Sequence, residues 1–119
     1  MKVIVVDDAA EVLQLVSRTL AAAGHEVVGY QSAEALEDKA ALEKPDVILL
    51  DVVMPDRNGY QALRGLKKRP ETKWIPVVVI SSKREPSDIE WGKAQGADDY
   101  LTKPFTPEAL RSVVERFRR

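Results

Sequence analysis

Three runs of four aliphatic residues stand out along the chain: Val3–Val6, Val47–Leu50 and Val77–Ile80. Continuous aliphatic runs of this length, bounded by turn-forming residues, are typical of strands buried on both faces of a sheet. The segment from Glu26 to Tyr30 is more polar, which favours an edge strand. Asp99 to Thr102 is predicted as a short fifth strand.

Between these segments, apolar residues recur every three or four positions, which predicts amphipathic helices. The first helix carries Val12, Leu13, Val16 and Leu20 and should stop at Gly24. The others are predicted to begin at Ser32 (with Ala33, Leu36 and Ala40 inside), Asn58-Gly59, Pro86-Ser87 and Thr106-Pro107. Five alternations of strand and helix predict a doubly wound α/β fold, a parallel sheet covered by helices on both faces.

Length, composition and net charge exclude several classes of function. At 119 residues we expect a single domain over 1–119 without an output domain in this chain. The formal net charge of −1 indicates neither direct nucleic-acid binding nor attraction to an anionic membrane. The absence of cysteine excludes disulfides, thiolate metal sites and thiol catalysis. No apolar stretch approaches the roughly 18 residues of a membrane span. We therefore expect a cytoplasmic protein with no membrane insertion.

Four isolated residues are interpreted structurally. His25, the only histidine, should be exposed at a loop-to-strand junction, and Trp74 should pack at the mouth of the strand that follows it. Trp91 is either a partner contact or a core residue. Gly92, inside the fourth helix, costs about 1 kcal/mol relative to alanine, so this helix should be the weakest and the first to open.

Polar groups capable of chemistry follow the predicted strands. Asp7 and Asp8 end the first aliphatic run, Asp51 and Ser81 end two others, and Lys103 follows the fifth strand. The carboxyl ends of parallel strands lie at one edge of a sheet, so these side chains can converge there. Close carboxylates repel and hold protons unless a cation intervenes. An oxygen-rich site of this kind suits Mg²⁺ or Mn²⁺.

The two remaining groups suit a phosphoryl group. Lys103 supplies a compact positive charge, and the Ser81 hydroxyl can donate a hydrogen bond. The set predicts that Asp51 attacks phosphorus and becomes an acyl phosphate. Taken singly, each residue has a plainer interpretation: Asp8 as a helix cap, Ser81-Ser82 as a loop start. Their joint occurrence at one sheet edge is what favours the chemistry.

The motifs Val5-Val6-Asp7-Asp8, Leu50 to Pro55 with Gly59, Ser81-Ser82 and Gly96 to Phe105 together resemble response-regulator receiver domains, the family of the bacterial chemotaxis regulator. The resemblance implies a flavodoxin-like fold with strand order 2-1-3-4-5. It implies that Asp51 is the phosphoacceptor and that Asp8 and Asp51 bind Mg²⁺ directly. Asp7 would act through water, and the Val53 backbone carbonyl would be a further ligand. Lys103 would pair with the phosphoryl group, and its bond to Pro104 would be cis.

The resemblance also implies partners and a switch. A sensor histidine kinase or phosphotransfer protein would donate the phosphoryl group. Ser81 and Tyr100 would couple it to a face made by the fourth helix, fifth strand and fifth helix, which binds a downstream protein. The protein would be a monomer or a weak dimer. A weaker resemblance, around Ser81 to Lys83 and Trp91 to Ala97, is to regulators of type IV pilus twitching motility.

Two departures bear on the chemistry. Ser81 stands where threonine is common in the family, and neither Val53 nor Lys83 can position an attacking water. We therefore hypothesise slow self-hydrolysis, with Val53 shielding Asp51 and Lys83 competing for phosphoryl oxygens. Two alternatives stay open. An aspartyl-phosphate phosphohydrolase would need a second Asp where Val53 stands, and a docking receiver would have lost phosphorylation altogether.

Overall fold

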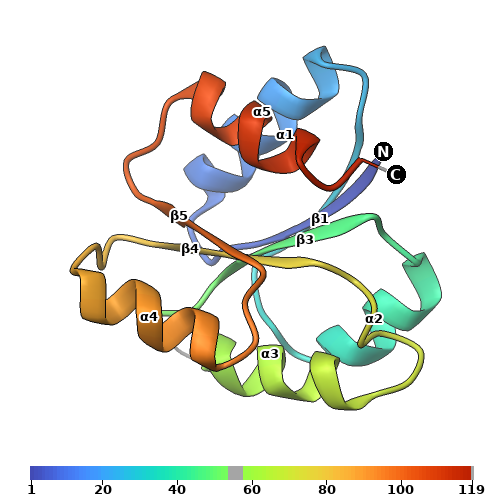
Figure 1. The fold of residues 1–119 in the computed structure, drawn as a ribbon. Coiled ribbons are helices and arrows are strands. Elements are labelled where there is room, and N and C mark those ends of the chain that lie inside the picture. Colours follow the sequence, from blue (N-terminus) through green and yellow to red (C-terminus); the bar gives the residue numbers. More distant parts are fainter. Residues whose placement is uncertain (54–57, 119) are drawn as a thin grey trace.

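In the computed structural model, which describes residues 1–53 and 58–118, one parallel sheet is formed by five strands in the order β2-β1-β3-β4-β5. This order and the alternation of elements confirm the predicted doubly wound fold (Figure 1). In chain order the elements are β1 (Lys2–Val6), α1 (Ala10–Ala22), β2 (Glu26–Tyr30), α2 (Leu36–Glu43), β3 (Val47–Asp51), α3 (Gly59–Lys68), β4 (Val77–Ser81), α4 (Pro86–Ala94), β5 (Asp99–Thr102) and α5 (Pro107–Glu115).

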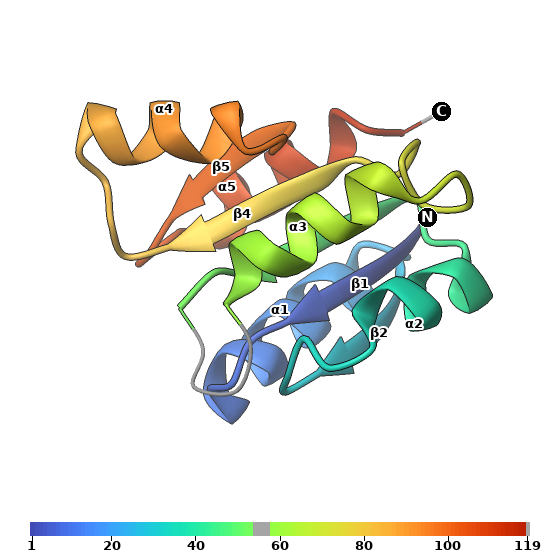
Figure 2. The ribbon, with the colours of Figure 1, turned by 90° about the horizontal axis from the view of Figure 1, so that it is seen from below.

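Helices cover both faces of the sheet. α1 and α5 lie on one face, and α2, α3 and α4 lie on the other (Figure 1). Alternate residues of each central strand enter different cores, so Leu49 packs on the α1/α5 side while Ile48 and Leu50 pack on the other. Every residue of β3 and β4 is buried, as their aliphatic runs predict. The strands run in one direction, so their carboxyl ends share an edge (Figure 2).

The helix starts follow local capping chemistry. The Asn58 side chain accepts a hydrogen bond from the Tyr60 amide at 2.8 Å, and the Thr106 hydroxyl accepts one from Ala109 at 3.1 Å. The second helix departs from its predicted start. It begins at Leu36, because the Ser32 hydroxyl accepts from Glu34 and forms a turn instead of a cap. Asp8 does not cap α1 either, since Ala9 occupies the N-cap position without a side-chain bond.

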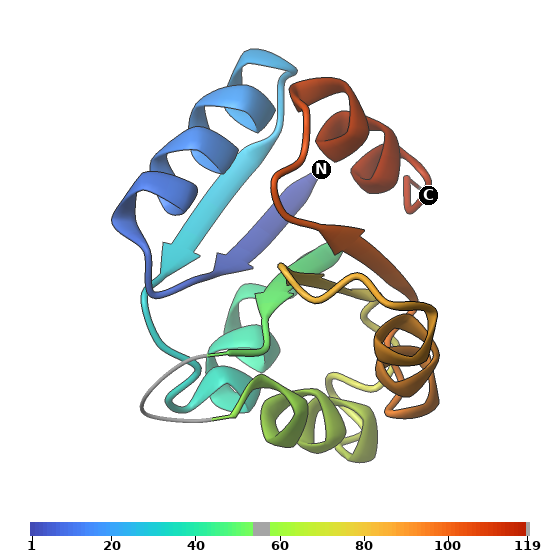
Figure 3. The same ribbon diagram turned by 90° about the vertical axis from the view of Figure 1, so that its left-hand side faces the viewer.

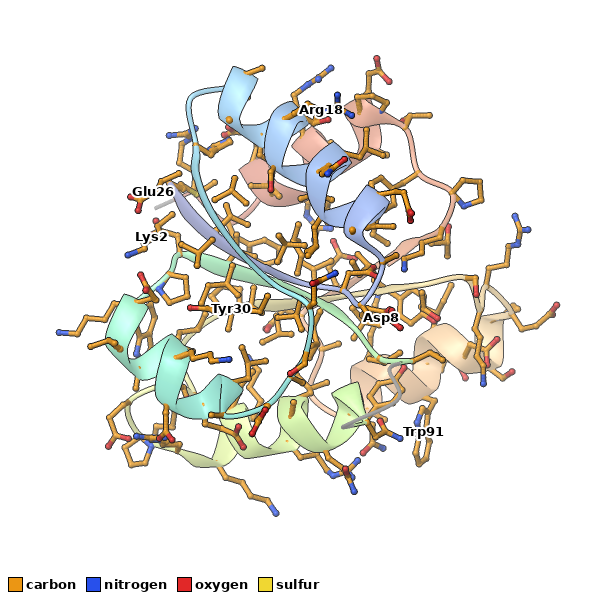
Figure 4. All side chains as sticks on the ribbon, turned by 180° about the vertical axis from the view of Figure 1, so that it is seen from behind. Lys2, Asp8, Arg18, Glu26, Tyr30 and Trp91 are labelled. Atoms are coloured by element: carbon orange, nitrogen blue, oxygen red, sulfur yellow. The ribbon has the colours of Figure 1, made fainter. Side chains whose placement is uncertain are left out.

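The expectation of an exposed His25 is wrong: its ring is buried. Nδ1 lies 3.2 Å from the Met1 ammonium and Nε2 lies 3.2 Å from a Glu115 oxygen, so the start of β1 and the end of α5 close over it. The two tryptophans are more exposed than core residues. Trp74 is 44% exposed, with its Nε1 donating to the Glu71 carbonyl. Trp91 is 57% exposed, which excludes the core alternative, and it projects from the α4 side of the molecule (Figure 4).

Candidate functional site

Three carboxylates meet at the carboxyl edge of the sheet, the edge that faces the viewer in Figure 3. Asp7, Asp8 and Asp51 each offer one oxygen, and these oxygens all lie within 4.8 Å of one another. The register explains the meeting, because Val6 pairs with Leu50 and the next residues of both strands emerge side by side. Asp7 and Asp51 are buried and Asp8 is exposed, so the cluster opens to solvent at Asp8 beside the end of β1 (Figure 4).

Lys103 closes the cluster from the other side. Its Nζ donates to Asp7 Oδ2 at 2.6 Å and lies 3.6 Å from Asp51 Oδ2. Its backbone amide donates to the Ser81 carbonyl at 2.8 Å, which fixes the residue directly beyond β5. The Lys103–Pro104 peptide is cis, as the resemblance implied. One ammonium therefore contacts two of the three carboxylates.

The pKa of the Asp51 carboxyl reflects the charge balance of the site. Burial raises the pKa of its carboxyl, and the neighbouring charges of Asp7 and Asp8 raise it further. The hydrogen bond from the Val53 amide, at 3.1 Å, and the charge of Lys103 only partly offset these effects. The site thus holds more negative charge than its own residues neutralise. A cluster of carboxylate oxygens open to water on one side fits the ligand preference of Mg²⁺ or Mn²⁺.

The predicted switch residues meet at the backbone of Lys83. The buried Ser81 hydroxyl accepts a hydrogen bond from the Lys83 amide at 3.1 Å. The hydroxyl of Tyr100, which is half-buried, donates to the Lys83 carbonyl at 2.7 Å. Both residues are therefore tied to the backbone of one residue, Lys83, in the loop after β4. Their coupling can run through the main chain of this loop.

The first turn of α3, whose Gly59 belongs to the family motif, is part of the site. A Cβ on Gly59 would lie 2.5 Å from the Asp51 carbonyl oxygen and from Val52 Cα, so glycine is required for this close approach. Beside it lies a cavity of about 260 Å³, whose lining includes Val53, Tyr60, Ser81, Lys83, Trp91 and Tyr100. Tyr60 carried no sequence signal, because its role depends on which helices become neighbours.

Most of the predicted residues converge in space, and their chemical roles stay predictions. The Val53 amide bonds Asp51 while its side chain is 60% exposed, but nothing in the geometry places its carbonyl against the carboxylates. The Val53 carbonyl as a metal ligand is therefore still a prediction. Met54 and Pro55 of the matching motif lie outside the described residues.

The fold and the site define a class of protein, the response-regulator receiver domain, and comparison with known families agrees. The model of the response regulator receiver domain matches residues 3–115, so this chain belongs to that family. Proteins of this class are phosphoacceptor switches of two-component signalling. Within the part of the chain that the structure describes, no helix is both long and apolar enough to cross a bilayer.

Individual relatives sharpen the assignment. Protein PilH of Pseudomonas aeruginosa is 41% identical over 113 residues, which are 95% of this chain and 93% of PilH. This relative supports the weaker resemblance to pilus regulators. The transcriptional regulatory protein PhoP of Bacillus subtilis is 35% identical over 99% of this chain, which spans only 48% of PhoP. The structure of the chemotaxis response regulator CheY4 of Vibrio cholerae superposes with a TM-score of 0.91 at 34% identity, covering 98% of both chains.

Proposed function

We propose that Asp51 accepts the phosphoryl group and that Asp7, Asp8, Ser81 and Lys103 serve this one reaction. The supporting observation is the position of Asp51. It ends a fully buried strand, lies within a cluster of three carboxylates, and has the ammonium of Lys103 3.6 Å away. A carboxylate held rigidly at the lip of a sheet and only partly neutralised is suited to attack phosphorus in line.

The transfer is a displacement at phosphorus. An oxygen of Asp51 forms the new O–P bond as the N–P bond of a phosphohistidine breaks, and the electron pair of that bond returns to the imidazole nitrogen of the donor. Lys103 can then turn from Asp7 towards the phosphoryl oxygens, and the Ser81 hydroxyl can donate to one of them. Attack of water on the acyl phosphate restores the Asp51 carboxylate and releases inorganic phosphate.

The carboxylates would hold a divalent cation, with Asp8 and Asp51 as direct ligands, Asp7 acting through water and the Val53 carbonyl completing the protein donors. When bound there, Mg²⁺ or Mn²⁺ supplies positive charge against the phosphoryl oxygens. Asp7 has a second role, since its Oδ2 accepts a hydrogen bond from Lys103 Nζ at 2.6 Å in the unphosphorylated protein. Loss of that bond is how Lys103 would become available to the phosphoryl group.

The proposed output is a change in the face formed by α4, β5 and α5. Ser81 and Tyr100 are both tied to Lys83, so movement of the Ser81 hydroxyl towards a phosphoryl oxygen would loosen the loop that leads into α4. The partners are a sensor histidine kinase or phosphotransfer protein and a downstream protein target. We place this module in the cytoplasm, as a monomer or weak dimer that turns over no small substrate. The likeness to PilH makes motility the pathway to test first.

Intact-mass measurement tests the acceptor. The chain is incubated with acetyl phosphate and Mg²⁺, and we expect a mass increase of one HPO₃ that is lost in Asp51→Asn. The matched control is Asp38→Asn, which removes an exposed carboxylate of α2 that pairs with Arg69. An adduct that persists in Asp51→Asn, or none in the wild type, would refute the proposal. Steady turnover of a phosphate ester would favour the phosphohydrolase instead.

A further inference from the structure

We infer that Tyr60 is a positioning residue that links the acceptor end of β3 to α4 through Gly92 and the ring of Tyr100. This inference rests on the proposed function and adds a second connection to it, separate from the loop that joins Ser81 to Tyr100. It is carried by two glycines, one at each end of the connection. At Gly59 two elements lie closer than a side chain would allow, and at Gly92 a side chain would crowd its neighbours.

The first close approach seats α3 on the acceptor strand. The Gly59 amide donates to the Val52 carbonyl at 3.2 Å, and a Cβ at Gly59 would lie 2.5 Å from the Asp51 carbonyl oxygen. Real Cβ atoms do not come so near to backbone atoms, so the first turn of α3 packs directly against the backbone of Asp51 and Val52. Tyr60 is the next residue, and its amide is held by the Asn58 cap.

The second close approach lies under α4. Gly92 is the one residue of α4 that is buried. A Cβ there would lie 3.1 Å from Cδ2 and Cε2 of Tyr100 and 3.1 Å from the hydroxyl oxygen of Tyr60. Two tyrosines from different elements therefore converge on the spot that the missing side chain leaves free. α4 therefore packs on this pair of tyrosines, whereas most surface helices pack through a stripe of aliphatic side chains.

The surroundings of the Tyr60 hydroxyl agree with this placement. Burial raises the pKa of Tyr60, and the charges that Tyr100 and Asp88 can carry raise it further; both residues line the same cavity as Tyr60. Asp88 is itself part of α4, where its carboxylate accepts a hydrogen bond from the Glu85 amide at 3.1 Å. Tyr60 thus faces α4 at its first turn and at Gly92.

A consequence follows for the resting helix. A glycine inside a helix lowers the stability of that helix, so glycine at position 92 is favoured only if close packing restricts the space for a side chain. A shift of the end of β3 on phosphorylation would move Gly59, and with it Tyr60, against Gly92. The path through Tyr60 differs from the path through Lys83, because it reaches α4 from α3 and shares only Tyr100 with the other.

The test compares Tyr60→Phe with the wild type, before and after phosphorylation by acetyl phosphate and Mg²⁺. Tyr30→Phe is the control, since Tyr30 is also half-buried against the same core but lies on β2. Intact mass reports phosphorylation, and hydrogen exchange reports residues 86–94. We expect Tyr60→Phe to be phosphorylated normally while the change in α4 exchange on phosphorylation falls at least about threefold. Tyr30→Phe should behave as the wild type.

A double-mutant cycle checks the contact without phosphorylation. The change in Tm caused by Gly92→Ala should be more favourable by about 2 °C in the Tyr60→Phe background than in the wild-type background, because the hydroxyl that the new methyl meets is gone. Additive effects in this cycle would refute the contact. Normal phosphorylation of Tyr60→Phe with an unchanged α4 response would refute the positioning role alone. Failure of the wild type to be phosphorylated would instead refute the proposed function.

Discussion

The two helices beside β5 are held in opposite ways. α5 buries Leu110, Val113 and Val114 in the core that it shares with α1, whereas α4 buries only Gly92. The strand between them divides accordingly: Leu101 packs with the α5 side and Tyr100 with the α4 side. A helix fixed by aliphatic side chains moves only when the core opens. A helix that packs on the Tyr100 ring and the Tyr60 hydroxyl can move with the site.

Asp51, the proposed acceptor, lies between the α5 side and the α4 side of the sheet edge. On the α5 side, Lys103 is bound to Asp7 and supplies the site with its cation. On the α4 side, the cavity beside Asp51 is lined by Lys83, Tyr60 and Tyr100, whose contacts lead into the helix. Under the proposed function, residues on the α5 side fix the position of the reacting groups, and residues on the α4 side pass the effect of phosphorylation to α4.

The largest expected effect is a difference in unfolding free energy between a substitution in α5 and one in α4. Leu110→Ala removes a side chain that is completely buried, and we expect it to lower the free energy of unfolding by about 3 kcal/mol. Ile89→Ala, in the half-exposed stripe of α4, should cost less than about 1 kcal/mol. Denaturant unfolding of both variants measures the difference. Equal losses would mean that α4 is as firmly packed as α5.

Removing Lys103 tests the α5 side of the site. Lys103→Met leaves Asp7 buried without its cation, and we expect a loss of about 2 kcal/mol, below the range for fully buried pairs because the lysine is partly exposed. Mg²⁺ should restore more stability to this variant than to the wild type, since it meets no competing ammonium. Lys67→Met, which breaks the pair with Asp98, is the control and should show no such rescue.

The lifetime of the phosphoryl group tests the α4 side. If Val53 shields Asp51 and Lys83 competes for phosphoryl oxygens, Val53→Asn and Lys83→Glu should each speed hydrolysis, by about tenfold or 1.4 kcal/mol of barrier. The decay of the phosphorylated mass after removal of donor gives the rate. Unchanged lifetimes in both variants would show that neither side chain protects the acyl phosphate.

The smallest expected effect is a pH dependence of stability. Because the pKa of Asp51 is raised on folding, its ionisation destabilises the folded protein as pH rises past its unfolded value, and no penalty remains when the group is protonated in both states. At pH 7 without divalent cations, Asp51→Asn should therefore raise Tm by about 4 °C, or about 1 kcal/mol. Below pH 3 the difference should vanish. A variant that is less stable than the wild type at pH 7 would contradict the charge balance described for the site.

The sequence predicted what depends on short stretches of chain. Aliphatic runs located β1, β3 and β4, and the Asn58 and Thr106 caps located the starts of α3 and α5. The convergence of Asp7, Asp8, Asp51 and Lys103 also followed, because a parallel sheet brings strand ends to one edge.

What could not be predicted depends on closure in three dimensions. His25 is buried by elements that come from opposite ends of the chain, and no local pattern announces that. That Gly92 weakens its helix stays a prediction, and its position against two tyrosines depends on which elements lie beneath it. Tyr60 was missed for the same reason. In each case a residue is defined by a neighbour that is distant in sequence.

Hydrogen exchange on the phosphorylated protein tests the central claim most directly. Amides of residues 86–94 and of residues 107–115 are followed with and without acetyl phosphate and Mg²⁺, and Asp51→Asn serves as the control that cannot be phosphorylated at this site. We predict that exchange in α4 changes on phosphorylation, that exchange in α5 does not, and that neither changes in Asp51→Asn. An equal response in both helices, or a phosphorylated protein with no response in α4, would contradict the account.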